Sequence, residues 1–217
     1  DFGTDIIFTR GPLDVLDHSS DTFSFGGKAG VDATVKLTEE LQVRSEMIHR
    51  GKTPGEDITD FLDVPFIKAF RIYKTDRGTR MLIIGVDPSG DPGSIMKACA
   101  LLRKNADKSL FRLVIAADHT VDHDDAFMMA WQVLGNSDPV RDHYFLSGDS
   151  LLIDGTIKLY REGGFPRRWP NVVCSDIETI ERINMKWDSL GFDKELQSPS
   201  LKNIKLLRNG LDSIITA

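Results

Sequence analysis

Apolar residues in the middle of the chain form short continuous runs separated by stretches with helical spacing. The runs "RMLIIGV" (80–86) and "FRLVIAA" (111–117) are typical of strands buried on both faces. Between and after them, residues 93–104 and 123–135 place apolar side chains three and four positions apart, which predicts two helices. A further strand is predicted at 142–146. This alternation of strands and helices predicts an α/β fold with a parallel or mixed sheet flanked by helices.

The flanking regions carry weaker patterns. "DIIFTR" predicts a strand at 5–10, and the Gly-, Ser-, Asp- and Pro-rich stretch at 11–30 predicts a long irregular connection. Partial alternation predicts another strand at 66–74. Amphipathic spacing and capping residues predict three further helices, at 38–51, 176–190 and 198–213.

One phrase occurs twice, as "VDATVKL" (31–37) and "IDGTIKL" (153–159). Each copy follows a second matching block, "DIIFTRG" (5–11) in the first case and "DHYFLSG" (142–148) in the other. Two matched blocks in the same order indicate that a structural unit has been duplicated. The second copy has lost most of the loop between its blocks.

This repeat defines the expected domain organisation. We expect a truncated first copy at 1–51, a linker at 52–65, a complete second α/β unit at 66–197 and a C-terminal helix at 198–217. The chain begins at Asp1, directly before a predicted strand, and we interpret it as a piece of a longer polypeptide.

Composition narrows the function classes. The net charge of −6 argues against a general binder of nucleic acids or of membrane surfaces. No apolar run approaches the roughly 20 residues that a membrane-spanning helix needs. Cys99 and Cys174 do not form a disulfide framework, and such cysteine usage fits a reducing cytoplasm.

The densest cluster of possible ligands is "DHTVDHDD" at 118–125. If Asp87 and Asp118 end neighbouring parallel strands, they lie at the sheet edge where α/β proteins bind ligands. One interpretation is therefore a metal or small-molecule site that uses these two acids with His119 and His123. The favoured interpretation is structural, because acids at a helix start bind its exposed amides.

The repeated D-[AG]-T-x-K phrase also has two interpretations. Asp32 and Thr34 can hydrogen-bond the local backbone and fix a loop, which we favour. Lys36 and Lys158 could instead bind an anion or simply be solvated. The glycines of "GVDPSGDPG" follow a strand but match neither a dinucleotide fingerprint nor a phosphate-binding loop.

Several of these motifs together resemble one known family. The strand and Asp-rich turn "FRLVIAADHTVD", the helix and turn "AWQVLGNSDPVRD" and the phrase "GGKAGVDATVK" (26–36) resemble the C-terminal domain of the UbiD decarboxylases. The loop "RGPLDVLDHSS" (10–20) and the ending Trp187-Asp188-Ser189-Leu190-Gly191 fit the same resemblance, which covers roughly 5–40 and 70–191. The phrase at 31–37, which is closer to the family's D-A-T-x-K motif than the one at 153–159, comes before the complete unit. This order resembles that of longer family members with a duplicated C-terminal region.

The resemblance implies a carboxy-lyase that removes CO₂ from an aromatic or unsaturated acid, with quinone biosynthesis as one setting. It implies prenylated FMN with a divalent metal, and a Glu–Arg–Glu network that protonates the product. These groups belong mostly to a preceding domain, and no segment here matches it. We therefore expect this chain alone to be inactive and assign it no catalytic or metal residue. Substrate and direction of reaction stay open.

For this chain the resemblance implies a supporting role. Pro12 and Leu13 are expected to line the substrate pocket, and Lys28, Asp32 and Asp118 are candidates for binding a ligand or fixing a loop. The expected partners are an aromatic acid, further copies of the chain in a homo-oligomer, and a flavin prenyltransferase that supplies the cofactor in the cytoplasm. The alternative is a non-catalytic α/β module for interaction or oligomerisation.

Overall fold

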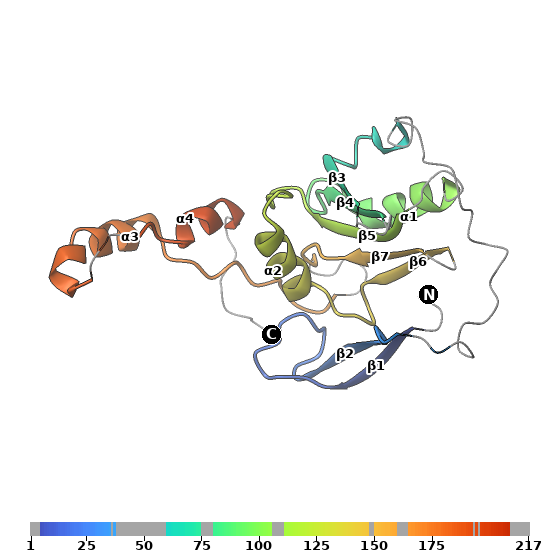
Figure 1. Cartoon of the computed structure of the whole chain (residues 1–217), viewed down its shortest axis with the longest axis horizontal. Coiled ribbons are helices and arrows are strands. Elements are labelled where there is room, and N and C mark those ends of the chain that lie inside the picture. Colours follow the sequence, from blue (N-terminus) through green and yellow to red (C-terminus); the bar gives the residue numbers. More distant parts are fainter. Residues whose placement is uncertain are drawn as a thin grey trace. The chain divides into compact units, whose positions relative to one another are not determined.

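The computed structural model divides the chain into two compact units, residues Asp1–Ile157 and Lys158–Ala217 (Figure 1). It describes residues 5–35, 37, 60–74, 80–105, 111–147, 150–159, 165–192, 194 and 196–208. The predicted helix at 38–51 lies outside these residues.

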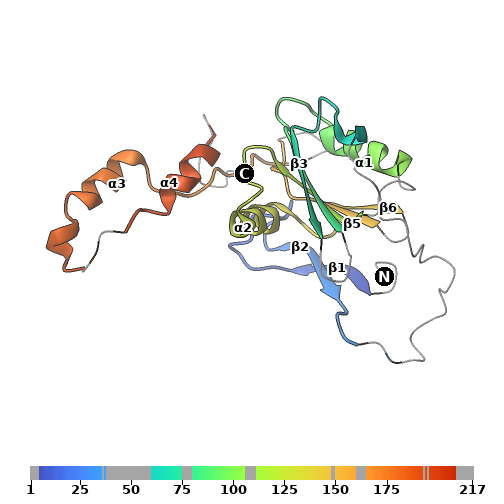
Figure 2. The ribbon, with the colours of Figure 1, turned by 45° about the horizontal axis from the view of Figure 1, so that its top comes forward.

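The first unit contains a five-stranded sheet with the strand order β3-β4-β5-β7-β6 (Figure 1). Figure 2 shows the same unit from a second direction. Its strands are β3 (Ala69–Lys74), β4 (Arg80–Val86), β5 (Phe111–Asp118), β6 (His143–Ser147) and β7 (Ser150–Asp154). The central strands β4, β5 and β7 run parallel, whereas the edge strands β3 and β6 are antiparallel to their neighbours. The sheet is therefore mixed.

The predicted strand at 142–146 is present as β6, but it is not the third parallel strand. That position belongs to β7, which sequence reasoning missed and which pairs with β5 from Leu113↔Leu151 to Ala116↔Asp154. The physical reason is the tight connection after β6: Ser147 pairs with Ser150, and so short a loop can join only antiparallel strands.

Two helices follow the parallel strands β4 and β5, as the apolar spacing predicts. They are α1 (Ser94–Lys104) and α2 (Ala126–Asn136). Asp125 caps α2, its carboxylate accepting a hydrogen bond from the Met128 amide at 3.0 Å. On α1, Ala98, Cys99 and Leu102 pack into the main core with apolar residues of the sheet: Leu82, Ile84, Val86, Val114, Ala116 and Leu152.

A separate antiparallel hairpin of β1 (Ile6–Pro12) and β2 (Phe25–Val31) completes the described part of the first unit. β1 confirms the predicted strand at 5–10. The prediction of irregular chain through residue 30 is wrong for β2, whose sequence "FGGKAGV" lacks apolar alternation. Glycine-rich strands carry little local signal, and this one is held by its pairing with β1.

The second unit contains short helical segments: α3 (Ile177–Asn184), η4 (Trp187–Leu190), α4 (Ser200–Asn203) and η5 (Ile204–Leu206). The continuous helix predicted at 176–190 is thus divided into α3, which Asp176 caps, and η4, which ends at Gly191. The predicted helix at 198–213 appears as two short turns within 200–206, and residues beyond 208 lie outside the described part.

A short 3₁₀ turn, η2 (Asp60–Leu62), precedes the sheet, and its Leu62 is buried in the main core. Within the described residues, the structure contains no helix that is both long and apolar enough to cross a membrane.

Candidate functional site

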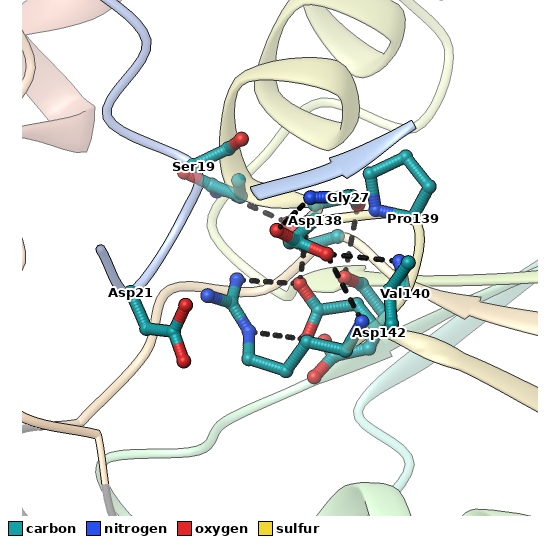
Figure 3. A network of polar contacts seen from close by, with 12 residues as sticks. Ser19, Asp21, Gly27, Asp138, Pro139, Val140 and Asp142 are labelled. Atoms are coloured by element: carbon teal, nitrogen blue, oxygen red, sulfur yellow. Dashed lines mark hydrogen bonds and ion pairs between the residues drawn. The ribbon is translucent and has the colours of Figure 1, made fainter. Parts of the chain in front are cut away.

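A network of buried polar contacts joins the β1–β2 hairpin to the turn before β6 (Figure 3). The Asp138 carboxylate, on the turn before β6, is 1% exposed. Its Oδ2 accepts a hydrogen bond from the Gly27 amide of β2 at 2.8 Å. Its Oδ1 accepts from the amides of Val140 at 2.8 Å and Arg141 at 3.1 Å. One buried carboxylate therefore binds its own turn and a strand 111 residues away.

A second buried acid, Asp142, fixes the turn that carries Asp138. Its Oδ2 accepts a hydrogen bond from the Asp138 amide at 2.7 Å, and its own amide donates to the Asp138 carbonyl oxygen at 2.8 Å. The Arg141 guanidinium donates to both Asp142 carboxylate oxygens, at 2.9 and 2.6 Å. Such a two-point contact fixes orientation as well as charge.

These contacts keep Asp138 ionised. Burial by itself raises the pKa of Asp138, but the amides of Gly27, Arg141 and Val140 and the charge of Arg141 together outweigh it. The pKa of Asp138 therefore lies below its ordinary value. Hydrogen bonds donated to a carboxylate favour its charged form, so the contact with the hairpin is charge-assisted.

The close approach at this junction requires glycine. A Cβ on Gly27 would overlap the Asp138 carboxylate and lie 2.6 Å from the Val140 nitrogen. At Gly26 a Cβ would lie 2.5 Å from the Ser20 Cβ and 2.7 Å from Leu13 Cδ1. The two glycines of "GGK" therefore let the β2 backbone contact the Asp138 turn and the 12–24 loop directly.

The two D-[AG]-T phrases form the same local structure. Asp32 Oδ1 accepts hydrogen bonds from the Thr34 amide at 3.0 Å and the Thr34 hydroxyl at 2.6 Å. Asp154 Oδ1 accepts from the amide and hydroxyl of Thr156 at 2.9 and 2.6 Å. Both arrangements are the side-chain-to-backbone turns that Asp and Thr favour.

The parallel strands β4 and β5 bring Asp87 and Asp118 to one edge of the sheet, because Val86 pairs with Asp118. Each carboxylate has a structural hydrogen bond there. Asp118 Oδ2 accepts from the Ile157 amide at 3.1 Å, and Asp87 Oδ1 accepts from the Gly90 amide at 3.0 Å. Asp118 thereby fixes the segment that follows β7.

His123 lies over the end of β4. Its Cε1 is 2.5 Å from the position of a Cβ on Gly85, and its carbonyl oxygen accepts a hydrogen bond from the Tyr73 hydroxyl at 2.8 Å. Burial lowers the pKa of His123, and this effect outweighs its bond to the Asp118 backbone and the charge of Asp122. In the part of the chain that the structure describes, no three His, Cys, Asp or Glu side chains gather to hold a metal ion.

The five residues singled out from sequence do not converge on one site. Pro12 and Lys28 are exposed on the hairpin, and Leu13 packs beside Gly26, its amide donating to the Ser24 carbonyl oxygen. Asp32 lies at the opposite end of the hairpin from Pro12, since Ile6 pairs with Val31 and Pro12 with Phe25. Asp118 belongs to the five-stranded sheet.

Sequence reasoning left Asp138 and Gly27 out of the candidate site. The available signal was the pair of motifs "DPVRD" and "GGK", each of which stands out by itself. Nothing in the sequence pattern indicates that one motif binds the other, since the contact depends on how the hairpin packs.

Part of the chain is similar to a known protein family. Residues 57–156 match the family described as the 3-octaprenyl-4-hydroxybenzoate carboxy-lyase C-terminal domain, UbiD_C. This segment includes the whole five-stranded sheet, both helices α1 and α2, and the Asp138 turn.

Curated relatives also match the chain. An uncharacterized protein of Helicobacter pylori is 26% identical over 181 residues, which are 83% of this chain and 27% of that protein. An uncharacterized protein of Aeropyrum pernix is 29% identical over 118 residues, which are 47% of this chain and 24% of that protein. The chain thus spans about a quarter of the length of the curated relatives it matches.

Parts of two solved enzyme structures are also similar to this chain. The UbiD-class enzyme HmfF from Pelotomaculum thermopropionicum, in an evolved dimeric form with prFMN, gives a TM-score of 0.37 at 19% identity over 47% of this chain and 23% of that chain. Vanillic acid decarboxylase from Sedimentibacter hydroxybenzoicus in open form gives a TM-score of 0.39 at 15% identity. The match covers 61% of this chain and 30% of that chain. The family model, in contrast, matches residues 57–156 of this chain with the UbiD C-terminal domain.

Proposed function

We propose that the chain is the C-terminal part of a UbiD-like carboxy-lyase that decarboxylates an aromatic or unsaturated acid, with quinone biosynthesis as one setting. The observation that carries the proposal is the family match over residues 57–156. Because the chain spans about a quarter of its curated relatives, the activity belongs to the whole protein.

In this proposal the chain completes the substrate pocket through the loop between β1 and β2. Two contacts fix the base of the loop: the hydrogen bond from the Gly27 amide to the Asp138 carboxylate, and the packing of the Leu13 side chain beside Gly26. Large apolar side chains beyond that base remain exposed, including Leu16 at 85% and Phe23 at 81%. A rigid base with an apolar tip suits a loop that covers a pocket in the rest of the protein.

Prenylated FMN with its divalent metal would supply the electron sink for loss of CO₂ in the complete enzyme. The described residues of this chain do not fit such a metal centre, because no group of three potential ligands occurs among them. We therefore assign cofactor binding and proton transfer to the part of the protein outside this chain. This chain's own contribution is positioning and assembly.

We infer the partners from the same similarity to UbiD-like enzymes. The enzyme would assemble as a homo-oligomer and would receive its cofactor from a flavin prenyltransferase. Cys99 and Cys174 are both free, which supports a reducing cytoplasm as the site of action.

The direct test uses the full-length polypeptide, produced together with a flavin prenyltransferase. We expect the purified protein to contain prenylated FMN, read by mass spectrometry, and to release CO₂ from at least one member of a panel of aromatic and α,β-unsaturated acids. A well-folded full-length protein that binds no prenylated flavin would sink the proposal. In that case the chain would be a non-catalytic α/β interaction module.

The pocket role has its own test. Pro12→Ala and Leu13→Ala in the full-length enzyme should raise KM or change substrate preference while cofactor content stays the same. Leu16→Ala, in the same loop but more exposed, tests whether the effect extends to the tip. Unchanged kinetics in all three variants would remove the loop from the pocket.

A further inference from the structure

The two sequence blocks that repeat fold into two hairpins with the same register. In the first, Ile6 pairs with Val31 and Phe8 with Ala29. In the second, the aligned residues pair in the same way, His143 with Ile153 and Phe145 with Leu151. The sequence repeat is thus also a structural repeat over β1–β2 and β6–β7.

Hydrogen bonds beyond the strands repeat as well. The Asp32 amide donates to the Asp5 carbonyl oxygen at 2.8 Å, and the aligned Asp154 amide donates to the Asp142 carbonyl oxygen at 2.8 Å. Each acid then binds the threonine two positions later in the same manner. Four matching features of register and bonding make chance similarity of two hairpins a poor explanation.

The two hairpins contact each other through residues that are equivalent in the repeat. Phe8 aligns with Phe145, and their rings meet edge to face with centroids 6.5 Å apart. Phe8 also stacks on His143 at 3.9 Å. In a symmetric dimer with a two-fold axis, the same patch of each copy faces the other, so residues near the axis meet their own equivalents, as Phe8 and Phe145 do.

The bond between Gly27 and Asp138 also joins one copy to the other. In the first copy, Gly27 pairs with Arg10, which lies four residues after Ile6 on β1. In the second copy, Ile6 corresponds to His143, and Asp138 lies before His143 in the chain. Within a single hairpin these two positions would lie at opposite ends, about 13 Å apart at 3.3 Å per residue. A carboxylate cannot span that distance, so the bond requires two copies.

We propose that the β1–β2 hairpin occupies, on the second copy, the place that a second subunit occupies in a two-fold dimer. The partner of the β6 surface is then the first copy in the same chain. A chain with one copy could form the Gly27–Asp138 type of contact only between two molecules, and duplication has brought that contact inside one molecule. This inference stands on the two hairpins and does not depend on the proposed activity.

The test links the two equivalent phenylalanines in the full-length protein. Phe8→Cys with Phe145→Cys, in a Cys174→Ser background, is treated with a short-span bis-maleimide. We expect a link within one chain, seen as a monomer-sized band on a denaturing gel and as a joined peptide pair by mass spectrometry. The native mass should be the same before and after linking.

Two further pairs make the result specific. Phe23→Cys with Phe145→Cys should not link, because Phe23 lies beyond the Pro12–Phe25 end of the hairpin. Ile6→Cys with Phe145→Cys should link, since a two-fold relation makes this pair the counterpart of Phe8 and His143. Melting curves taken before linking check that each variant is folded.

Each remaining outcome overturns a defined part of the inference. Covalent dimers from the Phe8 pair would show that the contact lies between chains, and labelling without any link would show that the hairpins do not meet. A link at Phe8 without one at Ile6 would contradict the two-fold relation and leave an ordinary packing contact.

Discussion

The Asp138 carboxylate accepts a hydrogen bond from the Gly27 amide at 2.8 Å, across 111 residues of chain. This bond connects the β1–β2 hairpin to the segment that matches the UbiD C-terminal domain and carries β6. The charge of Asp138 and the missing side chain of Gly27 are both required for it. Each therefore gives a prediction.

Replacing Gly27 with alanine should weaken the junction, because the new Cβ would overlap the Asp138 carboxylate and press on the Val140 nitrogen. We expect a loss of about 1–3 kcal/mol in the free energy of unfolding, typical of an overpacked site. Gly11→Ala is the control, since its Cβ would meet only the Lys28 side chain at 3.7 Å. Urea unfolding of the two variants should separate them; equal stability would contradict the packing described here.

Removing the Asp138 side chain should cost more than removing an exposed acid. Asp138→Ala leaves the amides of Gly27, Val140 and Arg141 without their buried acceptor. We expect the free energy of unfolding to fall by about 2–4 kcal/mol. Asp21→Ala, which breaks only the exposed ion pair with Arg10, should cost less than about 1 kcal/mol. Denaturant midpoints of both variants measure the difference.

The low pKa of Asp138 predicts how this contribution depends on pH. A carboxyl whose pKa is lower in the folded state stabilises the protein above its unfolded pKa of about 4, and the contribution is lost as pH falls through the folded value. The stability difference between the wild type and Asp138→Asn should therefore be largest near neutral pH and shrink below about pH 4. A difference that grows toward acid would contradict an ionised Asp138.

His123 should give a second pH effect, at milder acidity. Burial lowers the pKa of His123 in the folded protein. As pH falls below about 6.5, the histidine is therefore protonated in the unfolded chain while it is still neutral in the folded protein. Stability should fall as pH drops below about 6.5, despite the nearby Asp118 backbone and Asp122. Melting temperatures between pH 7.5 and 5.5 should show a smaller decrease in His123→Gln than in the wild type.

The two cysteines should differ in reactivity. Cys99 is fully buried on α1, and burial raises its pKa to about 11, so little of it is thiolate. Cys174 is partly exposed, although burial and then Asp176 raise its pKa as well. Iodoacetamide at pH 8, followed by peptide mass spectrometry, should label Cys174 in the native protein and Cys99 only after unfolding. Rapid native labelling of Cys99 would contradict the α1 packing.

Local pattern alone determined two of the three parallel strands, β4 and β5, and the helices that follow them. β4 and β5 are continuous apolar runs, and α1 and α2 repeat apolar residues at helical spacing, so each can be recognised without its neighbours. The D-[AG]-T phrases were also readable, because their hydrogen bonds reach only two residues along the chain.

Only the tertiary structure decided where β2, β6 and β7 pair and what Asp138 binds. β2 is glycine-rich because it must approach the Asp138 turn, and that requirement removes the apolar alternation by which a strand is recognised. The bond from Gly27 to Asp138 joins two motifs far apart in the chain, and no local periodicity records which motif faces which. The sequence thus carried the repeated units, while the contact between the two copies came from their packing.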